Sequence, residues 1–198
     1  MTPVVAGGIK GTVKERLVKG RQVLAVVGLL EGESRTAALP ELSPLGADLL
    51  CKPLYPTTWY QLRAFDDLLQ SVHRYVFDGS EATGQRMGRL LAQQNLNDPR
   101  SGVTLEHTPL GAGAALQSYW KAHFNFGQVE YEPHTADGAA GVRIRLTGFP
   151  DMSACHGLVL MGWCAEAMEI ACGGKAHLRV EERPWMHHGV LSYTLTPG

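Results

Sequence analysis

The chain has 198 residues, which is enough for one domain with a sizeable hydrophobic core. Lysine and arginine number 18 and aspartate and glutamate 19, a net charge of −1. The chain lacks the surplus of basic residues found in nucleic-acid-binding domains and in polybasic membrane anchors, which argues against both classes.

No segment predicts export or a membrane span. The densest apolar run is 23–30, and a second run, 157–172, is interrupted by Glu166 and Glu169. Neither reaches the roughly 18 uninterrupted apolar residues of a spanning helix. The first eight residues lack the basic start and apolar stretch of a secretory signal. We therefore expect a cytoplasmic protein.

The first half of the chain is expected to be mainly helical. Residues 12–19 and 21–30 predict two short helices, and a loop containing Pro40 follows. Ser43 before Pro44 is typical of a helix start, because serine caps free amides and proline fits the first helical position.

The strongest helix signal covers residues 58–77, where apolar side chains recur every three or four positions. This stripe consists of Trp59, Leu62, Phe65, Leu69, Val72 and Val76. Residues 78–80 end that helix and cap the next, about 81–96. There Gly84, Gly88 and Ala92 form a small face, which predicts close approach by another element.

The region 97–113 is rich in turn-forming residues, and we interpret Gly111–Gly113 as part of a flexible connector. A helix over about 114–124 carries Trp120. From residue 128 onward the hydrophobic period changes from helical to alternating.

Four segments of the second half predict half-buried strands, at 128–132, 141–148, 176–182 and 190–196. Between the second and third, Ser153 caps a helix that runs to Cys172 and ends at Gly173. The predicted fold class is α+β, with N-terminal helices packed on an antiparallel sheet of about four strands and a long buried helix between strands two and three. We expect a single domain over 1–198, with a mainly helical half (9–126) and a strand-strand-helix-strand-strand half (127–198).

The helix after Ser153 is apolar on two faces. Met161 lies on one stripe, and Trp163 lies nearly opposite. One face can meet the sheet, while the other needs a second helix layer, a ligand cavity or a partner subunit. An ordinary central core helix explains the pattern equally well.

Short motifs in the second half occur in an order that resembles the 4-vinyl-reductase-type small-molecule-binding domain. They are FNFGQVEY at 124–131, LTGFP at 146–150, CHG at 155–157, GW at 162–163 and LRVEE at 178–182. That domain belongs to a superfamily with haem-nitric-oxide-binding domains and TRAPP vesicle-transport subunits. Residues 11–13 and 54–60 are similar to a myxobacterial paralogous family of unassigned function, so the resemblance covers about 9–196.

The resemblance implies an apolar small-molecule pocket between helices and sheet, and frequent homodimerisation. Aromatic side chains suit such a pocket. The candidate ligand-binding residues are Trp59, Phe65, Trp120, Phe124, Cys155 and Trp163. Packing in the core is the alternative, favoured for Trp59 and Phe65.

Phenol-sensing members of the superfamily hold a structural zinc, and the resemblance implies that Cys155 and Glu182 match two of its ligands. The other two positions carry Trp185 and Tyr193, so the zinc site is expected to be absent. The weak metal candidates that remain are Cys155, Glu182, His187 and His188.

A haem site is likewise not expected. The Tyr-x-Ser-x-Arg signature of the haem-binding relatives is missing, and His73 beside its apolar stripe is interpreted as a core residue rather than an axial ligand. The prediction is therefore no cofactor, with zinc or haem as minor alternatives.

No residue set predicts catalysis. The sequence has no Cys-x-x-Cys pair, no phosphate-binding loop and no hydrolase or metalloprotease signature. Glu166 and Glu169 are three apart, but carboxylates at that spacing are more often paired with Arg or Lys. Adjacency of Cys155 and His156 does not bring thiol and imidazole together. Enzymatic activity is left open, and a protein without catalytic activity is favoured.

Two functions follow as hypotheses. The first is a non-enzymatic sensory module that binds a small apolar or aromatic molecule or an acyl chain. The second is a dimeric adaptor for a protein partner, suggested by the two-faced helix. An enzyme or tetrapyrrole-binding protein is third.

Overall fold

The computed structural model describes residues 15–136, 138–149, 151–183 and 190–198. The helical half contains a short ribbon of two antiparallel strands and most of the helices. Its elements are β1 (Leu17–Lys19), α1 (Gly20–Val27), α2 (Gly32–Ala38), η1 (Leu39–Glu41), α3 (Pro44–Cys51), β2 (Trp59–Gln61), α4 (Leu62–Val76), α5 (Glu81–Asn97), η2 (Pro99–Ser101) and α6 (Pro109–His123). The sheet half contains β3 (Gln128–Ala136), β4 (Ala139–Thr147), α7 (Ala154–Cys172), β5 (Ala176–Glu182) and β6 (Leu191–Pro197).

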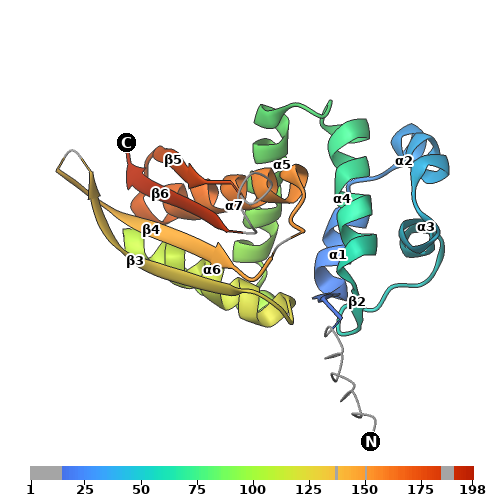
Figure 1. Ribbon diagram of the computed structural model, residues 1–198, viewed down its shortest axis with the longest axis horizontal. Coiled ribbons are helices and arrows are strands. Elements are labelled where there is room, and N and C mark those ends of the chain that lie inside the picture. Colours follow the sequence, from blue (N-terminus) through green and yellow to red (C-terminus); the bar gives the residue numbers. More distant parts are fainter. Residues whose placement is uncertain (1–14, 137, 150, 184–189) are drawn as a thin grey trace, which may run out of the picture.

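The four-stranded sheet is antiparallel, with strand order β3-β4-β6-β5. Ile144 of β4 pairs with Tyr193 of β6, and both side chains are fully buried on the inner face. Helices α6 and α7 cover that face, and α5 lies on the other side of α7 (Figure 1). The predicted α+β class and the long helix between strands two and three are confirmed.

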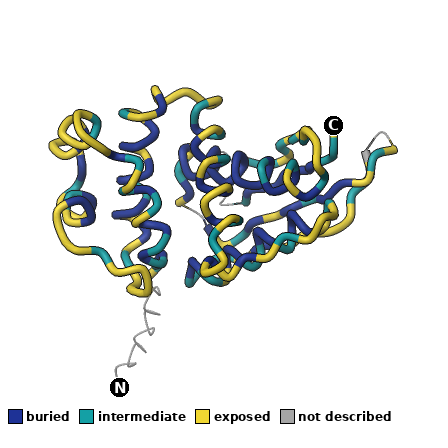
Figure 2. Tube along the Cα trace, turned by 180° about the vertical axis from the view of Figure 1, so that it is seen from behind, coloured by how far each residue is buried: buried dark blue, intermediate teal, exposed yellow. Residues whose placement is uncertain are grey.

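The earlier helices form a layer of their own rather than packing on the sheet. Helices α1 and α4 lie beyond α5, and α2 and α3 are outermost (Figure 1). Exposed residues gather on α2 and the loops at this outer end, whereas α7 is buried along most of its length (Figure 2). The helices that cover the sheet are thus α6 and α7.

Both faces of α7 are covered within the chain. Of the alternatives that its sequence left open, the structure shows a second helix layer, which is α5. The contact is built from small residues, because a side chain at Gly88 would overlap the Val159 carbonyl and one at Gly162 would overlap the Gln85 backbone. The predicted close approach to the small face of α5 is confirmed.

Helix ends follow the predicted capping residues. Ser43, Ser80 and Ser153 each accept a hydrogen bond from a backbone amide three residues later. Gly173 ends α7 in the left-handed conformation with φ 69°. These ends were readable because capping is a local interaction.

Three local predictions were wrong. Leu17–Lys19 is a strand, not helix, and Trp59–Gln61 is a strand that pairs with it before α4 begins. Helix α2 lies in a region expected to be loop. Two strands of three residues each are too short to show an alternating pattern, so their pairing partner decides their conformation.

The predicted flexible connector at Gly111–Gly113 is also wrong, because both glycines lie in the first turns of α6. Thr108 caps the helix by accepting from the Gly111 amide, and Pro109 occupies its first position. Gly111 packs against the Glu106 backbone and Gly113 against the Tyr131 ring. Close packing, rather than flexibility, accounts for both glycines.

Among the described residues, none of the helices is long and apolar enough to cross a membrane.

Candidate functional site

Five of the six residues expected to line an apolar pocket lie in the core where the two halves meet. The rings of Trp120 and Phe124 stack with centroids 4.1 Å apart, and Trp163 stacks on Tyr119 at 4.9 Å. Cys155 is buried on α7, where its thiol donates to the Leu69 carbonyl. Trp120 and Phe124 are thus in direct contact, and Tyr119 lies between Phe124 and Trp163.

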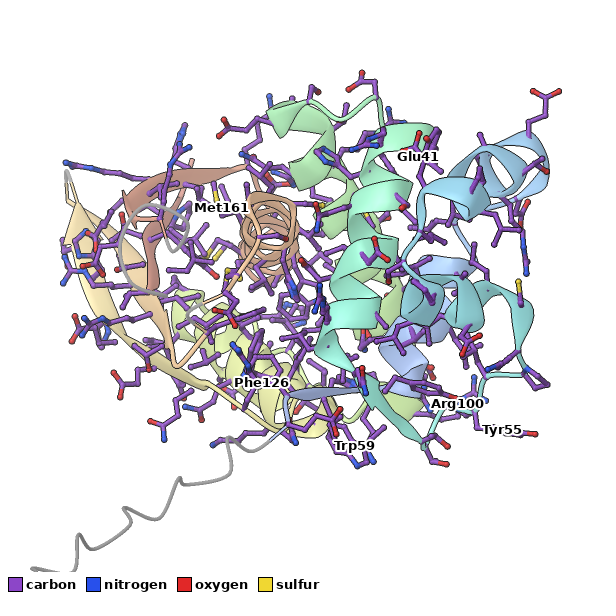
Figure 3. The ribbon with its side chains drawn as sticks, turned by 45° about the vertical axis from the view of Figure 1, so that its right-hand side comes forward. Glu41, Tyr55, Trp59, Arg100, Phe126 and Met161 are labelled. Atoms are coloured by element: carbon purple, nitrogen blue, oxygen red, sulfur yellow. The ribbon has the colours of Figure 1, made fainter. Side chains whose placement is uncertain are left out.

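The sixth residue, Trp59, lies apart from this cluster. It is 38% exposed on the β1–β2 ribbon, with the Lys19 ammonium 4.1 Å from its ring centroid. Figure 3 shows it near the lower edge of the molecule, away from the sheet. It lines a shallow groove with Leu49 and Leu54.

A hollow of about 440 Å³ opens where the helical half meets the sheet half. Three segments distant in sequence form its walls: the residues before β1, the start of α4, and the loop between β4 and α7. The lining residues are Glu15, Arg16, Gln61, Leu62, Arg63, Asp66, Phe149 and Asp151. None of them had been predicted as a site residue, because each is an ordinary surface or core residue in its own segment.

One wall of the hollow holds the two halves together. Asp66 of α4 accepts a hydrogen bond of 2.7 Å from the Ser153 hydroxyl at the start of α7. The buried His156 places its Nδ1 3.5 Å from the same carboxylate oxygen. We call Asp66, Ser153 and His156 the junction tether.

The electrostatics of the tether favour a charged carboxylate. Burial alone would raise the pKa of Asp66, but hydrogen bonding and charge from His156, together with the Ser153 hydroxyl, lower it below its ordinary value. The same carboxylate adds to burial in raising the pKa of the Cys155 thiol to about 12. Cys155 is therefore a neutral thiol rather than a nucleophile at neutral pH.

The tether does not have the arrangement of a hydrolytic triad. In such a triad the imidazole lies between serine and carboxylate and takes the serine proton. Here Ser153 donates directly to Asp66 instead. The group therefore positions α4 against α7 and supplies a polar wall to the hollow.

A second polar cluster, also unforeseen from the sequence, lies beside Tyr119. The Tyr119 hydroxyl donates to Gln22, and Gln22 donates to Asn95 within the core. The ring nitrogens of His123, 5.1 Å from the Tyr119 ring centroid, have no hydrogen-bond partner among the described residues. Burial lowers the pKa of His123 to about 4, so this imidazole is neutral at pH 7.

The paired carboxylates of α7 are explained by an ion pair. Arg89 of α5 donates to Glu166 at 3.0 Å and to Glu169 at 2.6 and 3.0 Å. The Nε2 atom of His73 lies 2.7 Å from the Ser80 carbonyl oxygen. This imidazole therefore joins α4 to the residue that caps α5. Both outcomes match the plainer interpretation of these residues.

Solved structures with this architecture give an independent comparison. A single-residue variant of the H-NOX protein from K. algicida in its unliganded Fe(II) form superimposes with a TM-score of 0.61 and 10% identity, covering 91% of this chain and 96% of that protein. The chain has the H-NOX fold. The K. algicida H-NOX protein without that substitution gives 0.59 at the same identity and coverage. The H-NOX protein from S. oneidensis, in its Fe(II)NO state, gives 0.52 at 14% identity, covering 91% of this chain and 99% of that one.

At these identities the likeness establishes the fold alone, which is that of haem-nitric-oxide-binding proteins. No protein-family model matches the chain, and no curated protein matches its sequence.

The prediction that no cofactor is involved is contradicted by this comparison. The three neighbours are H-NOX proteins described in Fe(II) states, so proteins that share this fold hold iron. Haem had been kept only as a minor alternative, because the sequence lacks the propionate-contacting signature.

The rings packed around His156 do not leave room for a haem. A macrocycle between two rings needs them about 7 Å apart, twice an ordinary contact distance. The rings of Phe65, Phe124 and Phe149 lie 5.8, 6.0 and 5.0 Å from the His156 ring. We therefore derive no chemistry through a haem at this junction.

The weak zinc candidates are not assembled either, so far as they are described. No group of three or more potential metal ligands is present among the described residues. Cys155 lies at the start of α7 and Glu182 at the end of β5. His187, His188 and Trp185 lie outside the described residues.

Proposed function

We propose that this chain is a sensory domain of the H-NOX fold that binds a small molecule in the hollow between its two halves. The observation that carries the proposal is that one residue, Asp66, both lines the hollow and forms the tether to α7. A molecule bound against Asp66 acts on the contact that positions α7. Since α7 is the central helix, its displacement reaches both α5 and the sheet.

The size and lining of the hollow support a small ligand. Its volume of about 440 Å³ lies near the lower end of the roughly 300–1,000 Å³ typical of small-molecule sites. Phe149 and Leu62 give it apolar surface, and the remaining walls are polar. The proposal therefore moves the ligand from the predicted aromatic pocket to the mixed surface beside it.

The finer resemblances stay proposals. The 4-vinyl-reductase-type domain is supported by the short motifs of the second half, and the myxobacterial family by residues 11–13 and 54–60. Homodimerisation is supported by the resemblance, and sedimentation velocity would check it. The adaptor hypothesis loses its motivating observation, because α5 and the sheet cover the two faces of α7.

The first experiment asks whether the gently purified protein holds a ligand, by native mass spectrometry and an absorbance spectrum. A thermal-shift screen then uses a small-molecule library that contains haemin, because the structural neighbours are iron proteins. We expect at least one compound to raise the melting temperature of the wild-type protein.

A plugged variant decides whether binding takes place in the hollow. Gln61→Trp places a large ring at an exposed lining position, and Gln94→Trp makes the same change at an exposed position of α5, away from the hollow. The compound should protect the wild type and Gln94→Trp, but not Gln61→Trp. Equal protection of both variants, or no protection by any compound, contradicts the proposal.

A further inference from the structure

The hollow carries both signs of charge, and some of these charges are already engaged. The Arg16 guanidinium pairs with Asp151, and Asp66 belongs to the junction tether. Two groups of opposite charge remain. The side chains of Arg63 and Glu15 have no hydrogen bond or ion pair with any described residue, and both are exposed at the mouth.

Arg16 also lines the hollow, but one of its donors is buried. Its Nη1 is inaccessible to solvent and has no hydrogen-bond partner among the described residues, although Nη2 is bonded to Asp151. Because this nitrogen is covered, Arg16 offers no free donor to a ligand in this packing. The exposed guanidinium of Arg63 is the donor that an anionic group on the ligand can reach.

The start of α4 adds to the same corner. Gln61 makes no side-chain cap, no acidic residue lies in the first turn, and the Leu62 amide is bonded to the Arg16 carbonyl. The next two amides have no partner within the helix and lie at the positive end of the helix dipole.

We propose that the ligand is a small zwitterion of the amino-acid class with an apolar side chain. Its carboxylate is received by Arg63 and its ammonium group by Glu15. Its apolar part lies against Leu62 and Phe149, both of which line the hollow from the core side. This inference rests on the proposed function, because it names the ligand class of the same hollow.

The discriminating probes are L-leucine and its two singly charged counterparts, 4-methylpentanoate and 3-methylbutylamine. Isothermal titration calorimetry and thermal shift measure each against the full-length protein, and the other natural amino acids are screened in parallel. We expect an apolar amino acid to bind at least about tenfold more tightly than either of its singly charged counterparts, since each of them leaves one charged group of the hollow unmatched.

Matched variants assign the two charges. Arg63→Gln and Glu15→Gln should each weaken amino-acid binding by about tenfold or more. Arg86→Gln removes an exposed arginine from α5, away from the hollow, and should bind as the wild type does. All three positions are exposed, so circular dichroism should show unchanged folding.

The outcomes separate this inference from the proposed function. If no amino acid binds, yet a library compound is excluded by Gln61→Trp, the ligand class is wrong and the site is right. If singly charged probes bind equally well, or Arg63→Gln and Glu15→Gln have no effect, the zwitterion is also wrong. A ligand that Gln61→Trp does not exclude overturns the site itself.

Discussion

The middle and the first turn of α7 are held in different ways. Along its middle, α7 meets α5 through glycines whose missing side chains bring two backbones together. At its first turn it meets α4 through a carboxylate, a hydroxyl and an imidazole beside an open hollow. A close-packed contact resists displacement, whereas a polar contact beside a hollow responds to a ligand or to protons. The α5–α7 contact therefore holds α7 in place, and the α4–α7 contact is the one that responds to a ligand or to pH.

The largest effect is expected where the backbones touch. Gly88→Val should lower the free energy of unfolding by about 4 kcal/mol or more, because the new side chain has to displace the Val159 carbonyl. Urea denaturation measures this change. Gly174→Ala is the control, since nothing lies near that position, and its stability should match the wild type. A well-folded, stable Gly88→Val protein would show that the α5–α7 contact is not close-packed.

The next effect concerns His123 and pH. With a pKa of about 4, the folded protein binds this proton less readily than the unfolded chain, whose histidine has a value of 6.5. Stability should therefore fall as the pH is lowered from about 6.5 to about 4, by about 3 kcal/mol in total.

Urea denaturation across this pH range measures the slope, and His123→Leu should flatten it. Replacing the exposed His107 with Gln is the control and should leave the slope as it is. An unchanged slope in His123→Leu would mean that another group takes up the proton.

The junction tether should give a smaller effect in a different pH window. Asp66→Asn should lower the free energy of unfolding by about 2 kcal/mol at pH 7, because the charged hydrogen-bond acceptor of the α4–α7 contact is lost. The pKa of Asp66 is lowered, so its contribution is present above the ordinary carboxyl value and is lost as the pH falls through the folded value.

The difference between wild type and Asp66→Asn should therefore shrink below about pH 4, the ordinary aspartate range. Asp48→Asn, which removes an exposed surface pair with Lys52, is the control and should change stability by less than about 1 kcal/mol. A pH-independent difference would contradict an ionised tether.

The smallest effect is expected for the ion pair at the exposed edge of the α5–α7 contact. A double-mutant cycle with Arg89→Gln and Glu169→Gln should give a coupling energy of about 1 kcal/mol or less, because both side chains are partly exposed. The same cycle on Arg74 and Glu41, a more exposed pair, should give still less. A coupling of several kcal/mol would show that this edge, rather than the glycine contact, holds α5 against α7.

Several features of the fold were predictable because their causes are local. Ser43, Ser80 and Ser153 marked helix starts, and alternation in β4 marked a strand with one buried face. Gly84, Gly88 and Ala92 indicated a close contact. Glycine destabilises a helix, so its repetition every four residues suggests that packing requires it. The partner of that face, α7, was not identified by the pattern.

The site was not predictable in the same way. The resemblance implied a pocket that aromatic residues could line, but aromatic residues also build a core, and only packing distinguishes the two. No sequence pattern marked Arg63, Glu15 or Asp66 as site residues, since each is a common surface residue in its own segment. The strand at Trp59–Gln61 was hidden because three residues do not reveal a period without their partner strand.

The sequence by itself determined the helix ends, the strands of the sheet half and the small face of α5, since capping, alternation and residue size act over a few neighbouring positions. The tertiary structure alone decided that α5 covers α7 and that residues from three distant segments enclose a hollow beside Asp66. Such contacts depend on chain closure over scores of residues, and no local pattern records where those segments meet.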